Sequence, residues 1–196
     1  MINTIYFDVD GVLVDLSKGL SLREGYDDPV LWFINMSETL GVRTYPAIIE
    51  KYIDEDIFVK CPPMPHHDNM KQLIDSLKQR RYKVKVLSSC MDKPYSEKIV
   101  EQKRKWLDTI MPRFFAHEDI HIVKGSQLKI DYIDENSILI DDYQRTYNTF
   151  VEKGIEDRFV LYRSFDDCVN KLQNLNIIFS FKKGVTTITR LRLALM

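Results

Sequence analysis

The chain has 196 residues, of which 44% are hydrophobic and 29% are charged, and its formal net charge at pH 7 is -1. This length suits one sizeable core with a small appended module, and the small net charge gives no general preference for nucleic acid or for a membrane surface. No run of about 18 apolar residues is present to span a bilayer, and no secretory signal opens the chain, so we expect a cytoplasmic protein without a membrane partner. Its cysteines form no C-x-x-C pair, which favours reduced thiols over disulfides at Cys61, Cys90 and Cys168.

Short apolar runs rich in β-branched residues alternate with helical patterns along most of the chain. Runs of this kind predict strands at 2–7, 84–87, 138–140 and 159–162. Helical spacing of apolar residues predicts helices at 66–81, 94–108, 143–153 and 165–175. Strands that alternate with helices favour an α/β fold, with a parallel sheet covered by helices on both faces.

The segment 17–64 interrupts this alternation. It contains two amphipathic helical patterns, at 29–40 and 46–55, and it closes with the stiff sequence CPPMP, which cannot continue a helix. We interpret the segment as a small α-helical cap inserted after the first strand. The catalytic core then comprises residues 1–16 and 65–175, and a module of this size beside a sheet edge is a candidate lid.

The last segment, 176–196, differs from the rest in composition. Two apolar runs around a K-K-G turn predict a β-hairpin that serves as an edge or dimer element, which makes a homodimer one expectation, and a helical tail is the alternative. Its charged side chains are all basic: Lys182, Lys183, Arg190 and Arg192. A nucleic-acid contact is one interpretation of these charges, and a solvated strand face is the favoured one.

Polar side chains follow the ends of three predicted strands. They are the Asp8 and Asp10 pair, the Ser88 and Ser89 pair, and the Asp141 and Asp142 pair. Because the carboxyl ends of parallel strands meet at one edge of a sheet, we expect these groups to converge there. Two carboxylates 4 Å apart repel each other by roughly 4 kcal/mol at an effective dielectric near 20, so either a cation or protonation is required. Hard carboxylate oxygens favour Mg2+, which commonly takes its remaining ligand from a phosphate.

Four segments of the chain together resemble, in order, the four motifs of the haloacid dehalogenase superfamily. These segments are DVDGVL from Asp8, VKVLS ending at Ser88, KIDYIDEN from Lys129 and ILIDD ending at Asp142. The closest likeness is to the deoxyribonucleotidase-like branch, on account of Asp15, the sequence PPMP, the serine pair and the Trp-bearing segment KRKWL. The resemblance implies a Rossmann-like core with a small helical cap after the first strand.

The resemblance also implies roles for the first motif. Asp8 would be the nucleophile and would form an aspartyl-phosphate, which divides hydrolysis into two steps. Asp10 would protonate the leaving oxygen and then activate water, as a general acid that becomes a base. Gly11 would permit the turn that brings both carboxylates to one phosphorus atom.

The remaining motifs would hold the phosphate and the metal ion. Ser88 would donate to the phosphoryl oxygens, and Ser89 either assists it or begins the next loop. Lys129 would neutralise the developing charge. Four aspartates would supply the ligands of Mg2+: Asp8, Asp141 and Asp142 through their carboxylates, and Asp10 through its backbone carbonyl.

Two assignments remain open at this point. Lys124, in the segment IVKGSQLK, competes with Lys129 for the lysine role, and the spacing to the ILIDD strand favours Lys129. The aromatic residues of the insertion either stack on a nucleobase or form the cap's own core; they are Trp32, Phe33 and Tyr45.

The sequence HEDIH at 117–121 fits the H-E-x-x-H zinc pattern, but its surroundings leave too little room for the required helix.

These motifs lead us to expect a Mg2+-dependent phosphomonoesterase of the 5'-nucleotidase type, with a nucleoside or deoxynucleoside monophosphate as substrate. A polynucleotide 3'-phosphatase and a sugar-phosphate phosphatase are alternatives that keep the same chemistry. A phosphate-binding module without turnover is a third reading, and the presence of both Asp8 and Asp10 argues against it.

Overall fold

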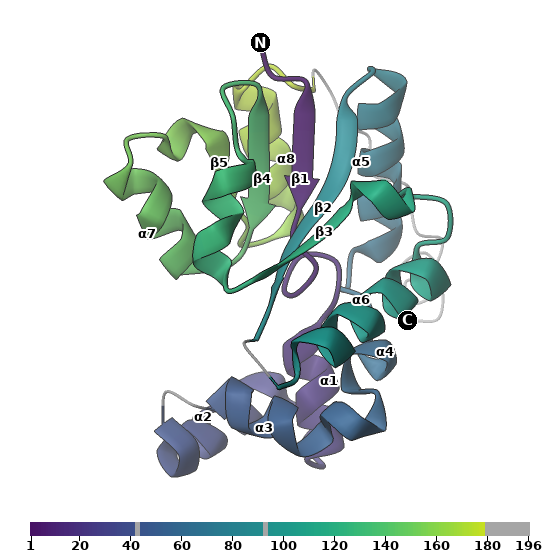
Figure 1. The fold of residues 1–196 in the computed structure, drawn as a ribbon, viewed down its shortest axis with the longest axis vertical. Coiled ribbons are helices and arrows are strands. Elements are labelled where there is room, and N and C mark those ends of the chain that lie inside the picture. Colours follow the sequence, from purple (N-terminus) through teal and green to yellow (C-terminus); the bar gives the residue numbers. More distant parts are fainter. Residues whose placement is uncertain (42–43, 92–93, 179–196) are drawn as a thin grey trace, which may run out of the picture.

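The computed structural model describes residues 1–41, 44–91 and 94–178 (Figure 1). The predicted C-terminal hairpin lies almost entirely outside these residues. None of the helices in the described ranges combines the length and the apolar character needed to cross a bilayer. The cysteines are buried free thiols, which agrees with the prediction of reduced side chains.

Five parallel strands form the central sheet, in the order β3-β2-β1-β4-β5. Their bounds are Thr4–Phe7 for β1, Lys83–Cys90 for β2, Ile120–Lys124 for β3, Ser137–Asp141 for β4 and Phe159–Leu161 for β5. In the centre of the sheet, Phe7 pairs with Val86 on one side and with Ile140 on the other. The predicted α/β fold with a parallel sheet is therefore confirmed, and its architecture is Rossmann-like.

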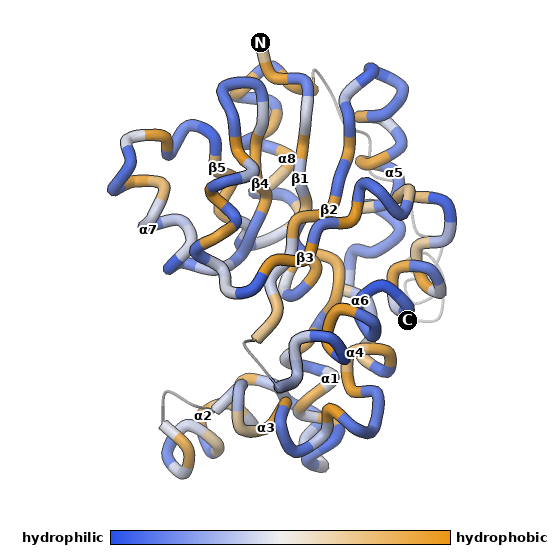
Figure 2. Tube along the Cα trace, in the orientation of Figure 1, coloured by the Kyte–Doolittle hydropathy of each residue, from blue (hydrophilic) through white to orange (hydrophobic). Residues whose placement is uncertain are grey.

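Alternating side chains of the strands build two separate cores. Ile5 and Phe7 belong to one buried cluster, whereas Tyr6 between them belongs to the other. The first cluster is covered by helices α5 (His67–Gln79), α6 (Ser96–Ile110) and α8 (Phe165–Asn174). The second is covered by the 3-10 helix η4 (Ser126–Tyr132) and by α7 (Gln144–Glu152). Figure 2 shows hydrophobic residues recurring along these strands and helices, with hydrophilic residues at the outer turns.

A group of short helices lies beyond the carboxyl ends of the strands (Figure 1). It contains α1 (Leu16–Arg23), α2 (Pro29–Leu40), α3 (Thr44–Tyr52), the 3-10 turn Ile53–Glu55 and α4 (Ile57–Lys60). The pattern of the sequence predicted α2 and α3 but missed α1 and α4. Helix α1 carries a glycine and two serines, so its apolar periodicity is weak, and its start is fixed instead by Asp15, whose side chain accepts a hydrogen bond from the Lys18 N–H.

Strand β3 was also missed by the sequence pattern. The segment HEDIH divides between a 3-10 turn at His117–Asp119 and this strand, so His117 and His121 do not share a helix face. The expectation that this segment is no helical zinc motif is therefore confirmed.

Candidate active site

The first strand delivers Asp8 to the carboxyl edge of the sheet, beside Asp141 at the end of β4. The Asp8 N–H donates to the Ile140 carbonyl at 2.9 Å, so the sheet pairing extends one residue past β1. Both carboxylates are buried, with Asp8 5% exposed and Asp141 fully enclosed. The Val9 N–H donates to Asp8 Oδ1 and the Tyr143 N–H donates to Asp141 Oδ1. Backbone hydrogen bonds therefore fix the orientation of both side chains.

Lys129 joins these two carboxylates. Its Nζ lies 2.9 Å from Asp8 Oδ2 and 2.7 Å from Asp141 Oδ2, and its side chain is 1% exposed. Burial alone would lower the pKa of Lys129, but the charges of Asp8 and Asp141 outweigh burial and raise it above the ordinary lysine value. Lys124 is instead exposed at the end of β3. Of the two candidate lysines, Lys129 is the one that the fold places between the acids.

Asp142 completes a group of three acids whose ligand atoms all lie within 4.8 Å of one another, together with Asp8 and Asp141. Burial raises the pKa of Asp142 to about 8, and the negative charges of Asp8, Asp141 and Asp10 add to the effect. Burial and the Asp8 charge likewise raise the pKa of Asp141, against the opposing influence of Lys129. A set of crowded carboxylate oxygens without sulfur or imidazole donors fits Mg2+.

Gly11 allows the backbone to pass directly over Asp142. Its φ of +74° is unfavourable for other residues, and a Cβ atom built there would lie 2.0 Å from Asp142 Oδ2. The Gly11 N–H donates to the Val14 carbonyl, which closes the turn after Asp10. Glycine at this position therefore has both a conformational and a steric cause.

Asp10 lies on this turn with its side chain 26% exposed. Its Oδ2 atom accepts a hydrogen bond from Lys103 Nζ at 2.5 Å. Burial raises the pKa of Asp10, the Lys103 charge opposes the rise and the Asp8 charge adds to it, with a net increase. A carboxyl group with a raised pKa is suited to carry a proton near neutral pH.

The predicted strand ends at residue 87, but β2 runs to Cys90, so Ser88 and Ser89 lie within its last residues, in different environments. Ser88 is fully buried and its Oγ is 3.1 Å from Lys103 Nζ. Ser89 lines the cleft above the acids, and its carbonyl accepts from the same Lys103 at 2.6 Å.

Sequence reasoning missed Lys103 as a member of this site. Its signal was present, because Lys103 occupies the apolar stripe of α6 that is formed by Ile99, Trp106 and Leu107. A lysine on the buried stripe of a helix needs an acidic or polar partner inside the protein.

A cleft of about 680 Å³ opens between the sheet edge and the cap. Asp8, Asp10 and Asp142 form its acidic floor. Its remaining walls are mainly apolar or aromatic, from Leu16, Tyr45, Pro46, Ile49 and Met64 on the cap side and Met91, Tyr143 and Tyr162 on the core side. This volume and mixed character are typical of small-molecule sites.

The three aromatic residues proposed to stack on a base have different positions. Tyr45 lines the cleft, and its hydroxyl lies 2.6 Å from Ser17 Oγ. Trp32 is fully buried and packs edge-on against Phe33 and Tyr45, as part of the same hydrophobic cluster as Ile5 and Phe7. Phe33 is 40% exposed but does not line the cleft. The structure therefore leaves Tyr45 as the stacking candidate of the three.

Comparison with known proteins finds a weak structural likeness and no likeness in sequence. No protein-family model matches the chain, and no curated protein matches it. A solved structure that does match is that of DsGPDH of Dunaliella salina, with 13% sequence identity and a TM-score of 0.42. The match covers 87% of this chain and 36% of that one, so the chain spans well under half of the solved protein's length. A likeness this weak carries no argument about fold or activity.

Proposed function

We propose that the protein is a Mg2+-dependent phosphomonoesterase of the haloacid dehalogenase type, with a nucleoside or deoxynucleoside monophosphate as its substrate. The observation that carries this proposal is the placement of Lys129 between Asp8 and Asp141, with Asp142 beside them at the carboxyl edge of the sheet. These are the positions at which the sequence matches the motifs of that superfamily. The helical group of residues 16–60 corresponds to the cap of such an enzyme.

The charge balance of the site supports a divalent cation. Among the described residues, the ion pairs of this site join Asp8, Asp10 and Asp141 to two ammonium groups, those of Lys103 and Lys129. With Asp142 beside them, the four acids carry two negative charges more than these lysines offset when all four are ionised. A bound Mg2+ supplies this missing charge and neutralises phosphoryl oxygens during transfer.

In the first step, Asp8 attacks the phosphorus atom. A bond forms between a carboxylate oxygen of Asp8 and phosphorus while the bond from phosphorus to the ester oxygen breaks. Asp10 gives its proton to that ester oxygen, which leaves as an alcohol. Lys129 holds Asp8 in place and offsets the negative charge that gathers around the reacting phosphoryl group.

In the second step, a water molecule replaces Asp8 on phosphorus. Asp10, now ionised, takes a proton from the water as its oxygen attacks. The bond between phosphorus and Asp8 breaks, which releases inorganic phosphate and returns both carboxyl groups to their starting states. The raised pKa of Asp10 suits it to both transfers.

The cleft supports a nucleotide-sized substrate. Its volume of about 680 Å³ exceeds the need of a phosphate alone, and the Tyr45, Tyr143 and Tyr162 side chains provide rings beside the acidic floor. Aromatic rings stack on any nucleobase, so this lining favours a base-bearing ester without selecting the base.

A panel of phosphate esters assayed with Mg2+ tests the proposal. Inorganic phosphate released from nucleoside 5'- and 3'-monophosphates, sugar phosphates and a 3'-phosphorylated oligonucleotide is measured for the wild type and for Asp8→Asn. We expect the highest kcat/KM for a nucleoside monophosphate and a loss on the order of 10³-fold or more in Asp8→Asn. Acid-quenched wild type should carry covalent phosphate that the variant lacks.

Asp75→Asn is the matched control, since Asp75 is an exposed carboxylate on α5 outside the cleft. It should retain full activity. Turnover that persists unchanged in Asp8→Asn, or in the presence of EDTA, would exclude the mechanism. A higher kcat/KM for the 3'-phosphorylated oligonucleotide would indicate a polynucleotide 3'-phosphatase instead of a nucleotidase.

A further inference from the structure

Lys103 is a buried cation whose three N–H groups all meet acceptors. The acceptors are Asp10 Oδ2 at 2.5 Å, Ser88 Oγ at 3.1 Å and the Ser89 carbonyl at 2.6 Å, and the side chain is 1% exposed. An ammonium group has three donors, so this geometry uses its full capacity. Lys103 therefore connects the turn after β1 to the end of β2.

The hydrogen bond from Lys103 gives the two carboxylate oxygens of Asp10 different surroundings. Oδ2 is held by Lys103, whereas Oδ1 is buried and has no hydrogen-bond partner among the described residues. The hydrogen bond to Oδ2 is therefore the contact that orients this carboxyl group among the described residues.

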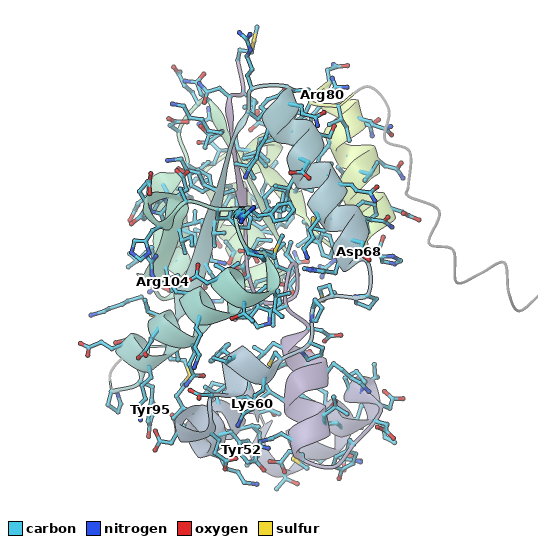
Figure 3. All side chains as sticks on the ribbon, turned by 90° about the vertical axis from the view of Figure 1, so that its right-hand side faces the viewer. Tyr52, Lys60, Asp68, Arg80, Tyr95 and Arg104 are labelled. Carbon is cyan, nitrogen blue, oxygen red and sulfur yellow. The ribbon has the colours of Figure 1, made fainter. Side chains whose placement is uncertain are left out.

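The cap holds Lys103 from its other side. The Phe58 ring of α4 faces the ammonium group, with its centroid 5.1 Å from Nζ. Next to Lys103 on α6, the Gln102 side chain accepts from the Phe58 N–H at 3.1 Å and donates to the Ile53 carbonyl at 2.6 Å. The Trp106 indole N–H donates to the Cys61 carbonyl at 2.8 Å. Figure 3 shows α6, which carries the labelled Arg104, between the sheet and the cap helices.

We infer that Lys103 is a positioning residue for acid–base catalysis: through its hydrogen bond to Oδ2 it holds the Asp10 carboxyl group in one orientation at the cleft. This inference rests on the proposed phosphomonoesterase function. It assigns Lys103 a task separate from that of Lys129, which holds Asp8 and Asp141. The two lysines thus pair with three of the four acids, Lys103 with Asp10 and Lys129 with Asp8 and Asp141.

The dependence of rate on the leaving group tests this role. A nucleoside leaves as an alkoxide that needs a proton, whereas 4-nitrophenolate leaves readily without one. In single-turnover measurements of phospho-enzyme formation, which exclude the second step common to both substrates, Lys103→Met should lower the rate for the nucleoside monophosphate by about 10²-fold or more, and for 4-nitrophenyl phosphate by less than about tenfold. KM should change little for either substrate, and Lys103→Arg should recover part of the lost rate.

Lys105→Met is the matched control, because Lys105 is an exposed lysine on the same helix. It should retain full activity on both substrates. A purely structural role for Lys103 predicts equal losses on both substrates, and this outcome would overturn the inference. So would a full rate in Lys103→Met.

A second measurement guards against misfolding of the single variant, which leaves Asp10 buried without its partner. The double variant Asp10→Asn, Lys103→Met lacks both charges, and adding Lys103→Met to Asp10→Asn should cost less than about twofold in kcat on 4-nitrophenyl phosphate. A full additional loss in the double variant would show that Lys103 does not act through Asp10.

A crystal structure of Lys103→Met separates this inference from the proposed function, because it needs no turnover. The Asp10 carboxyl group should leave the position it has in the wild type, and an unmoved carboxyl group would refute the positioning role. Wild-type protein that hydrolyses no phosphate ester would instead refute the proposed function.

Discussion

The backbone of Gly11 faces the carboxylate of Asp142 so closely that a Cβ atom on Gly11 would lie 2.0 Å from Asp142 Oδ2. This relationship predicts that Gly11→Ala displaces Asp142 and lowers phosphatase activity by about 10²-fold or more, since a misplacement of 1 Å costs that much in a positioned site. Gly154→Ala is the control, because Gly154 has a φ of +66° but no atom within 4 Å of a built Cβ. It should lose about 1 kcal/mol of stability and no activity. Equal activities of the two variants would contradict the steric argument.

Lys129 is expected to matter for both stability and turnover. Lys129→Met leaves the buried Asp8 and Asp141 without their shared partner, so we expect about 3–5 kcal/mol of destabilisation at neutral pH. Activity should fall on the order of 10³-fold. Urea unfolding and released phosphate measure the two effects. Lys124→Met removes the competing, exposed lysine and should change neither; a larger loss in that variant would reverse the assignment.

The raised pKa of Asp142 leads us to expect that the stability of the metal-free protein falls with rising pH. Its pKa of about 8 lies above its ordinary value of 3.8, so between these values the folded state binds more protons than the unfolded state. Its contribution to stability is therefore lost as pH rises towards 8, by at most about 1.4 kcal/mol per pH unit and less because the side chain is partly exposed.

Thermal unfolding in EDTA between about pH 7 and 8.5 tests whether stability falls with rising pH. This pH range lies above the one in which His67 and His121 gain protons. Tm should fall with rising pH in the wild type and less steeply in Asp142→Asn. Mg2+ should raise the wild-type Tm most at the upper end. Asp75→Asn should keep the wild-type slope, and a wild-type Tm that rises with pH would refute the argument.

The strands that could be predicted are those with continuous apolar runs. β1 and β4 lie in the middle of the sheet and are buried on both faces, so their sequences are nearly uninterrupted runs of large apolar residues. β3 lies at the edge, and its sequence IHIVK mixes apolar with half-exposed polar residues. Periodicity alone does not distinguish such a segment from a loop, since its identity as a strand comes from pairing with β2.

The residues of the candidate site likewise differ in whether a sequence pattern or only tertiary packing places them there. The sequence could predict that Asp8, Asp141 and Asp142 lie close together, because each is at the carboxyl end of a recognisable strand of a parallel sheet. Lys103 comes from the middle of a helix, and its approach to Asp10 depends on how α6 packs between sheet and cap. Trp32 was left open between stacking and the hydrophobic core, and its burial, which decides for the core, depends on packing that its residue type does not reveal.

Tyr45 is the aromatic side chain of the cap that the cleft exposes to a substrate, so it predicts a selective effect on binding. Tyr45→Ala should raise KM for a nucleoside monophosphate by about tenfold, because base stacking contributes about 1–3 kcal/mol, and should leave KM for a sugar phosphate nearly unchanged. Tyr45→Phe keeps the ring and loses only the hydroxyl contact with Ser17, so its KM should stay near the wild-type value. Phe33→Ala, outside the cleft, should change KM less than about threefold. An equal rise in KM for both substrates would show that Tyr45 shapes the cap and does not contact a base.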